Sequence, residues 1–126
     1  MNERQAQELD LLRTRHLCLE FLEDGLWVRI ARYSVPGDLW TMDEIEVACQ
    51  IPDSVAQAPY GFYVPRALTL KSGATIQSYA DGTTPFGGEW GKFSWQITWQ
   101  PAADIHSGTN MLDFVTSFAA RLREGA

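Results

Sequence analysis

The stretch LCLEFLEDGLWVRIARYSV, residues 17–35, decides the fold class of this chain. Two runs rich in apolar residues flank Glu23-Asp24-Gly25, a turn signal typical of a β-hairpin. In the second run, Trp27, Arg29 and Ala31 alternate with Val28, Ile30 and Arg32, so one face of the strand is more apolar. The stretch therefore predicts a pair of antiparallel strands.

Two further strands are predicted downstream of this hairpin. In DEIEVACQIP (residues 43–52), Ile45, Val47 and Cys49 alternate with polar or small residues, as in a half-buried strand. GFYVPRALTL (residues 61–70) predicts a fourth strand, which is interrupted. We expect a four-stranded antiparallel meander from about Leu17 to Leu70.

Helices are predicted at both ends of the chain. NERQAQELDLLRTRHL (residues 2–17) places Leu9, Leu12 and Leu17 near helical spacing, which predicts a short N-terminal helix. TNMLDFVTSFAARL (residues 109–122) predicts a C-terminal helix from about Thr109 to Arg123, with one apolar face formed by Met111, Phe114, Val115, Phe118 and Leu122. Between sheet and helix, residues 71–96 are rich in glycine and show little periodicity, so we expect a long irregular segment. The predicted fold is a single α+β domain that spans residues 1–126.

Composition excludes several classes of function. The 126 residues carry a formal net charge of −6, and the chain has no long cluster of Lys and Arg. Binding to nucleic acid or to an anionic membrane through a basic face is therefore not expected. No apolar run approaches the roughly 20 residues of a membrane span, and the polar N-terminus does not resemble a secretory signal, so we expect a cytoplasmic protein.

Cysteine and histidine show no pattern of a metal site or a structural disulfide. Cys18 and Cys49 both fall within expected strands, where we expect them to be small buried hydrophobic residues. His16 and His106 lie far apart, with no acidic or thiol ligand at a suitable spacing. We expect neither a metal nor a cofactor.

The order of elements and a set of spaced residues resemble the ubiquitin-conjugating-enzyme (UBC) superfamily, and most of all its bacterial branch, the prokaryotic UBC-like family E. The resemblance covers about residues 17–122. In the first half it rests on Pro36, Gly37, Ile45, Val47, Pro52, Pro59, Phe62, Tyr63, Leu68, Leu70 and Gly73. In WGKFSWQITWQPAAD (residues 90–104) it rests on Trp90, Phe93, Ser94, Trp99, Pro101 and Asp104.

The resemblance implies a UBC-like fold and a nucleophile at Ser94. Members of the superfamily place a His-Pro-Asn-like tripeptide ten residues before the nucleophilic cysteine and a Trp-x-Pro shortly after it. Here Thr84-Pro85-Phe86 precedes Ser94 by that spacing, and Trp99-Gln100-Pro101 follows. The cysteine itself is absent, Phe86 stands where the oxyanion-stabilising asparagine is expected, and Trp95 and Gln96 replace the arginine and histidine of family E.

A serine at this position needs help from its surroundings to act as a nucleophile. Its hydroxyl is essentially never ionised at neutral pH, so it requires a general base, for which Asp104, His106 and Asp81 are the candidates. Gly87, Gly88 and Gly91 could let a substrate tail approach the backbone and free N–H groups for an oxyanion. Trp90, Trp95 and Trp99, together with Gln96, could line the site, although core packing is the alternative reading of the tryptophans.

Two functions of different classes follow from the resemblance. In the first, the chain is a transferase that accepts a ubiquitin-like protein from an activating enzyme as an oxyester on Ser94. In the second, it is a non-catalytic UBC-like binding module that holds the ubiquitin-like protein or its activating enzyme without forming an ester.

Overall fold

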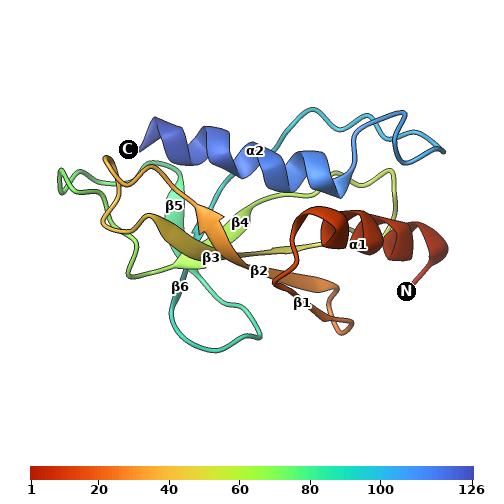
Figure 1. Cartoon of the computed structure of the whole chain (residues 1–126), viewed down its shortest axis with the longest axis horizontal. Helices are drawn as coiled ribbons and strands as arrows, with labels where there is room; N and C mark the ends of the chain where they lie inside the picture. Colours follow the sequence, from red (N-terminus) through yellow and green to blue (C-terminus); the bar gives the residue numbers. More distant parts are fainter.

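An antiparallel sheet carries two helices on one of its faces (Figure 1). The computed structural model describes all 126 residues. In chain order the elements are α1 (Glu3–Arg15), β1 (Leu19–Leu22), β2 (Trp27–Ser34), β3 (Glu44–Gln50), β4 (Phe62–Pro65), β5 (Tyr79–Gly82), β6 (Trp90–Phe93) and α2 (Met111–Glu124). The strands lie in the order β1-β2-β3-β4-β6-β5, and every neighbouring pair is antiparallel. The α+β class and the meander through β4 are confirmed.

Capping boxes begin both helices. Asn2 accepts a hydrogen bond from the Gln5 N–H at the start of α1, and the Gln5 side chain accepts one in return. Asn110 and Asp113 form the same reciprocal pair at the start of α2. Such boxes satisfy N–H groups that a helix cannot bond internally. Neither helix is long and apolar enough to cross a bilayer.

The core lies between the helices and the inner face of the sheet. All five residues of the predicted apolar stripe on α2 are fully buried, as are Leu9 and Leu12 of α1. Phe118 of α2 stacks on Phe62 of β4 at a ring-centroid distance of 4.0 Å, and Phe62 stacks on Phe93 of β6 at 4.9 Å. This stack joins α2 to the strand that precedes Ser94.

The sheet has six strands, so the predicted count of four is wrong. Residues 71–96, expected to be irregular, contain the hairpin of β5 and β6, and β6 pairs with β4. Each of these strands has four residues and includes a glycine. Their pairing is fixed by contacts with β4 and α2 that are distant in sequence, and local periodicity does not reveal such contacts.

The alternation predicted for the second strand fails at a β-bulge. Ile30 pairs with Val47 and Tyr33 with Ile45, so Ala31 and Arg32 together oppose one residue of β3. Arg32 adopts a left-handed backbone conformation with φ of 60°. The bulge returns Tyr33 to the buried face and leaves Arg32 exposed.

Two further expectations about the N-terminal region are wrong. Leu17 lies beyond the end of α1 and is 92% exposed, so it is not part of the apolar face. Cys18 is exposed and precedes β1, whereas Cys49 is buried in β3 as expected. Burial raises the pKa of the Cys49 thiol to about 12.

Candidate functional site

Ser94 follows β6 directly and lies on the outer face of the sheet, away from the helices. Its N–H donates to the Ser78 carbonyl at 2.9 Å, and the Gly61 N–H donates to the Trp95 carbonyl at 2.7 Å. The backbone hydrogen bonds of β6 with the chain before β5 and before β4 therefore continue past the end of the strand. Since Phe93 points into the core, alternation turns Ser94 to the opposite face, where it is exposed.

The candidate bases lie elsewhere, and no hydrogen bond joins any of them to Ser94. Asp104 accepts a bond from the His106 N–H at 2.9 Å, inside a loop closed by the bond from the Thr109 N–H to the Gln100 carbonyl. Asp81, on β5, forms an ion pair with Arg66. A general base must lie within hydrogen-bonding reach of the group that it activates. The Ser94 hydroxyl has no such partner here.

The segment after Ser94 explains this separation. From Ser94 to Gln100, exposed residues alternate with partly buried ones, and Trp95, Ile97 and Trp99 pack against the core. Gln96 falls on the exposed side of this alternation. An extended chain of six residues spans on the order of 20 Å. The loop with Asp104 and His106 therefore begins far along the chain from the serine.

The Thr84-Pro85-Phe86 tripeptide lies at the other end of the β5–β6 hairpin from Ser94. Gly82 pairs with Trp90 where the connecting loop leaves the hairpin, whereas Tyr79 pairs with Phe93 next to Ser94. The whole of β6, roughly 10–13 Å of strand, separates the two features. In Figure 1 the connecting loop projects from the sheet on the side opposite α2. The structure therefore does not bring the tripeptide to the serine.

The glycines of this region have structural roles away from Ser94. Gly87 and Gly88 have φ of 76° and 77°, which the turn of the β5–β6 loop requires. At Gly91 a Cβ atom would collide with the ring of Tyr79, which lies directly over the backbone. The absence of a side chain at Gly91 therefore makes room for the Tyr79 ring of the same chain.

Each tryptophan near Ser94 donates its indole N–H to a fixed partner in the fold. Trp90 is buried and donates to the Gly87 carbonyl at 2.6 Å. Trp95 donates to the Ser117 hydroxyl on α2 at 2.9 Å. Trp99 donates to the Val55 carbonyl at 2.9 Å. These bonds hold the β5–β6 loop, the extended segment and the β3–β4 connection in place.

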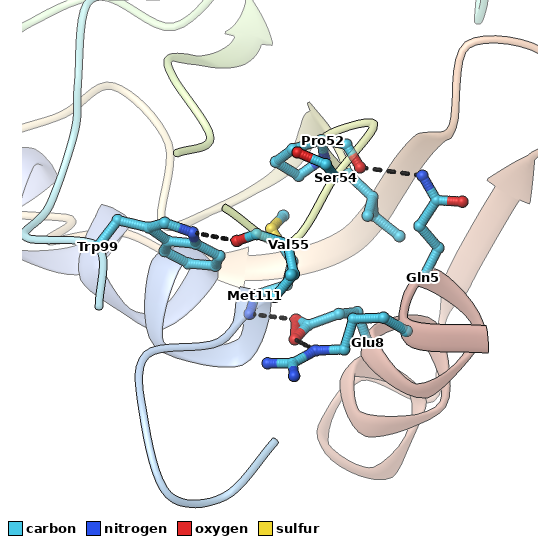
Figure 2. A pocket seen from close by; sticks show the side chains of 9 residues that line it. Gln5, Glu8, Pro52, Ser54, Val55, Trp99 and Met111 are labelled. Carbon is cyan, nitrogen blue, oxygen red and sulfur yellow. Dashed lines mark hydrogen bonds and ion pairs between the residues drawn. The ribbon is translucent and has the colours of Figure 1, made fainter. Parts of the chain in front are cut away.

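Trp99 also lines a small hollow where α1 meets the start of α2 (Figure 2). Here the buried Glu8 carboxylate accepts from the Met111 N–H at 2.6 Å and from Arg4 Nε at 3.1 Å. The Gln5 amide donates to the Pro52 carbonyl at 3.0 Å. The hollow holds about 10 Å³, roughly the space of one water. It is a junction of elements and is too small for a substrate.

Aromatic and basic side chains gather on the outer face of the sheet, which no helix covers. We call them the outer-face cluster: Trp27, Arg29, Tyr60, Tyr63, Phe86 and Lys92. The rings of Trp27 and Tyr63 lie 5.2 Å apart, and Phe86 of the β5–β6 loop packs edge-on against Trp27 at 6.3 Å. The Arg29 guanidinium lies 4.9 Å from the Phe86 ring centre.

Lys92 is the free cation of this cluster. Its ammonium lies 5.8 Å from the ring centre of Tyr60 and 5.4 Å from that of Tyr63, with no carboxylate within 4 Å. Arg29, by contrast, is paired with Glu20 at 2.5 Å and Glu46 at 4.0 Å. Lys92 and Ser94 are two residues apart on the same face, so the exposed hydroxyl lies at the border of the cluster.

Sequence reasoning missed Tyr60, Tyr63, Arg29 and Lys92 as site residues. In the stretch WGKF, Lys92 lies next to Phe93 and would point to the opposite face of a strand. This signal can be read only when the stretch is recognised as a strand. No three His, Cys, Asp or Glu side chains come together in an arrangement that could hold a metal ion.

The arrangement supports binding by surface contact better than it supports nucleophilic chemistry. Neither a family model, nor a curated protein, nor a solved structure matches this chain. Membership of the UBC superfamily stays a prediction that rests on the quoted residues.

Proposed function

We propose that this chain is a UBC-like binding module that holds a ubiquitin-like protein without forming an ester with it. The outer-face cluster is the observation that carries the proposal. The partner class comes from the family resemblance, and the binding mode comes from the geometry. The proposal includes a cytoplasmic location, where the protein would meet the ubiquitin-like protein and its activating enzyme.

The chemistry of the outer-face cluster suits a protein partner. Tyrosine, tryptophan and arginine are the residue types that contribute most to binding at protein interfaces. Tyr60 is 56% exposed in the free chain, so a large ring is open to a partner. Lys92 adds a positive charge that no carboxylate of this acidic chain neutralises. An apolar partner surface with a carboxylate at its rim would complement both features.

The same reasoning disfavours acyl transfer. The residues that the resemblance offers for catalysis are either used by the fold or separated from Ser94. The tryptophan N–H groups bond within the chain, Gly91 accommodates Tyr79, and Asp104 accepts from its own loop. A serine without a base is a poor nucleophile at neutral pH.

A titration with matched lysine variants tests the proposal. The chain has two lysines, and Lys71 is exposed and lies outside the outer-face cluster. We expect Lys92→Met to weaken binding of the ubiquitin-like partner about tenfold, the effect of roughly 1.4 kcal/mol at an interface hot spot. Lys71→Met should change affinity less than twofold. If calorimetry showed that both variants change the affinity equally, the outer face would not be the binding site.

The transferase is the second candidate, and one observation favours it. Ser94 is exposed at the border of the outer-face cluster, and its hydroxyl has no hydrogen-bond partner within the chain. A bound partner and activating enzyme could therefore reach it and supply the missing base. This candidate requires an acyl adduct that Ser94→Ala abolishes, whereas the binding module forms none.

A further inference from the structure

A basic hollow lies on a different part of the molecule, where the end of α1, the bulge of β2 and the middle of α2 meet. Its volume is about 350 Å³, at the lower end of small-molecule sites. It is lined by Arg15, His16, Arg32, Tyr33, Ser34, Thr116 and Ala119. We call it the bulge hollow.

Arg32 occupies the bulge in a conformation that an arginine rarely adopts. Its φ of 60° lies in the left-handed region, which costs a non-glycine residue about 1–2 kcal/mol. Glycine would remove this cost. A bulge also redirects a side chain that would otherwise follow the alternation of the strand. The bulge therefore places the Arg32 side chain at the rim of the bulge hollow, in spite of this strain.

His16 contributes a buried polar atom without a partner. Its ring stacks on that of Tyr33 at 6.4 Å with an interplanar angle of 19°. Its Nε2 atom is buried and makes no hydrogen bond. Leaving such a group unsatisfied costs about 1–3 kcal/mol, so the ring is held here by its packing and not by a hydrogen bond at Nε2.

The charges around the bulge hollow are unbalanced. Neither Arg15 nor Arg32 has a carboxylate within 4 Å, although acidic residues outnumber basic ones by sixteen to ten. Tyr33 adds no negative charge at neutral pH, since its ordinary pKa of about 10 is raised by burial to about 12, against the opposing effects of a backbone hydrogen bond and the nearby Arg123. The C-terminus of α1 contributes only about half a negative charge. Two guanidinium groups therefore leave a net positive site.

The helix dipole explains only part of this arrangement. Basic residues in the last turn of a helix are favoured by the dipole, and both Arg13 and Arg15 lie in the last turn of α1. Arg13 is 3.9 Å from Asp10, a carboxylate on its own helix. Arg32 lies on a strand, so the dipole accounts neither for it nor for the unpaired His16.

We propose that the bulge hollow binds a phosphate group, either as free inorganic phosphate or as part of a small phosphomonoester. Arg15 and Arg32 would each offer the forked N–H pair that matches phosphate oxygens. The exposed Thr116 hydroxyl would add an oxygen contact from α2. This site is separate from the outer-face cluster and does not depend on the proposed partner.

The pH dependence of binding combines two titrations, that of the His16 ring and that of the phosphate itself, whose second pKa is near 6 in a phosphoester. In the free chain, burial and the Arg15 charge lower the pKa of His16. A bound phosphate favours the protonated ring, so ligand binding and proton uptake support each other. The charged or titratable groups that line the hollow beside His16 are Arg15, Arg32 and Tyr33, and Arg123 lies near Tyr33. No carboxylate forms an ion pair with Arg15 or Arg32.

The test is a titration of the full chain followed by the NMR signals of the His16 ring, at ionic strength held constant with sodium chloride. Inorganic phosphate and adenosine monophosphate are the two probes. We expect saturable shifts at pH 7.5, where the phosphate carries close to two negative charges. Tighter binding of the nucleotide would identify a phosphomonoester site, and equal binding would identify a site for free phosphate. Shifts that stay linear in concentration would overturn the proposal.

Charge-neutral variants locate the site. We expect Arg32→Gln or Arg15→Gln to weaken phosphate binding at least tenfold, and Arg13→Gln, in the same helical turn as Arg15, to leave it unchanged. Arg32→Gly keeps the fold testable, because it relieves the backbone strain. It should raise the urea midpoint and lose the phosphate response. Retention of that response in Arg32→Gly, or equal losses in Arg13→Gln and Arg32→Gln, would contradict a site at the bulge.

Discussion

At the scale of single residues, several side chains that stand out in the sequence are committed to the fold. Trp90, Trp95 and Trp99 donate to Gly87, Ser117 and Val55, respectively. An indole N–H that already has a buried or local partner is costly to redirect toward a ligand. The exposed Tyr60 and the half-buried Lys92, which are unremarkable in the sequence, are the ones left open to a partner.

Gly91 provides a test of this structural reading. A methyl group at this position would collide with the Tyr79 ring, so Gly91→Ala should destabilise the chain by about 1–3 kcal/mol, the usual cost of overpacking. Urea unfolding measures the change. Tyr79→Leu should relieve part of the cost in the double variant, since the two residues are in contact. An additive double variant would show that Tyr79 is not the obstacle.

The two cysteines should differ in reactivity. Cys18 is exposed, whereas Cys49 is buried and its pKa is raised to about 12, so little reactive thiolate forms there at neutral pH. Native alkylation followed by mass spectrometry should label Cys18 quickly and Cys49 only on unfolding. Rapid labelling of both would mean that β3 opens readily or is misplaced.

At the scale of elements, α1 and α2 are joined by a single buried carboxylate. Glu8 accepts from the first N–H of α2 and from Arg4, so it caps a helix other than its own (Figure 2). A negative charge at a helix N-terminus is favoured by the dipole. Loss of the Glu8 charge leaves the buried Met111 N–H with a weaker hydrogen-bond acceptor.

We therefore expect Glu8→Gln to lower the free energy of unfolding by about 1.5–3 kcal/mol, the range for hydrogen bonds to charged groups. Glu3→Gln, an exposed position in the first turn of the same helix, is the matched control and should change it by less than about 0.5 kcal/mol. Chemical denaturation of both variants provides the comparison. Equal effects would mean that the link between the helices contributes little.

The elements with strong periodicity could be predicted from the sequence, and those fixed by distant contacts could not. The stripe on α2 and the alternation of Ile45, Val47 and Cys49 match the structure. β5 and β6 could not be found, since four residues carry little pattern and the close approach of Tyr79 to Gly91 is a tertiary event. The bulge at Arg32 likewise depends on the register with β3.

Because β5 and β6 could not be predicted, the geometry around Ser94 could not be predicted either. Ser94 stands ten residues after Thr84 in the chain, but the β5–β6 hairpin places them at opposite ends of a strand. Sequence spacing alone does not show whether the residues between Thr84 and Ser94 fold back and bring the two together or run along a strand and keep them apart. The position of Lys92 on the outer face could have been read from alternation only after β6 was known.

At the scale of the whole molecule, the stability of the chain should depend on pH through His16. Burial lowers the pKa of this ring in the folded state relative to 6.5 in the unfolded state. The stabilisation is therefore fully present above pH 6.5 and is lost as pH falls through the folded pKa. Wild type should lose more stability between pH 7.5 and 5 than His16→Gln does.

The second histidine of the chain supplies the control. His106 is exposed in the loop before α2, so His106→Gln should keep the pH profile of the wild type. Urea midpoints in phosphate-free buffer give the comparison. A steeper profile in His16→Gln than in the wild type would reverse the expected sign.

The measurement that tests the central claim most directly is the intact mass of the chain after incubation with the ubiquitin-like protein, its activating enzyme and ATP. If the chain is a binding module, the partner binds in the titration above, but the mass stays that of the unmodified chain with and without thiol reductant. An adduct that resists reductant, yields to hydroxylamine and disappears in Ser94→Ala would contradict the account and establish Ser94 as the acyl carrier.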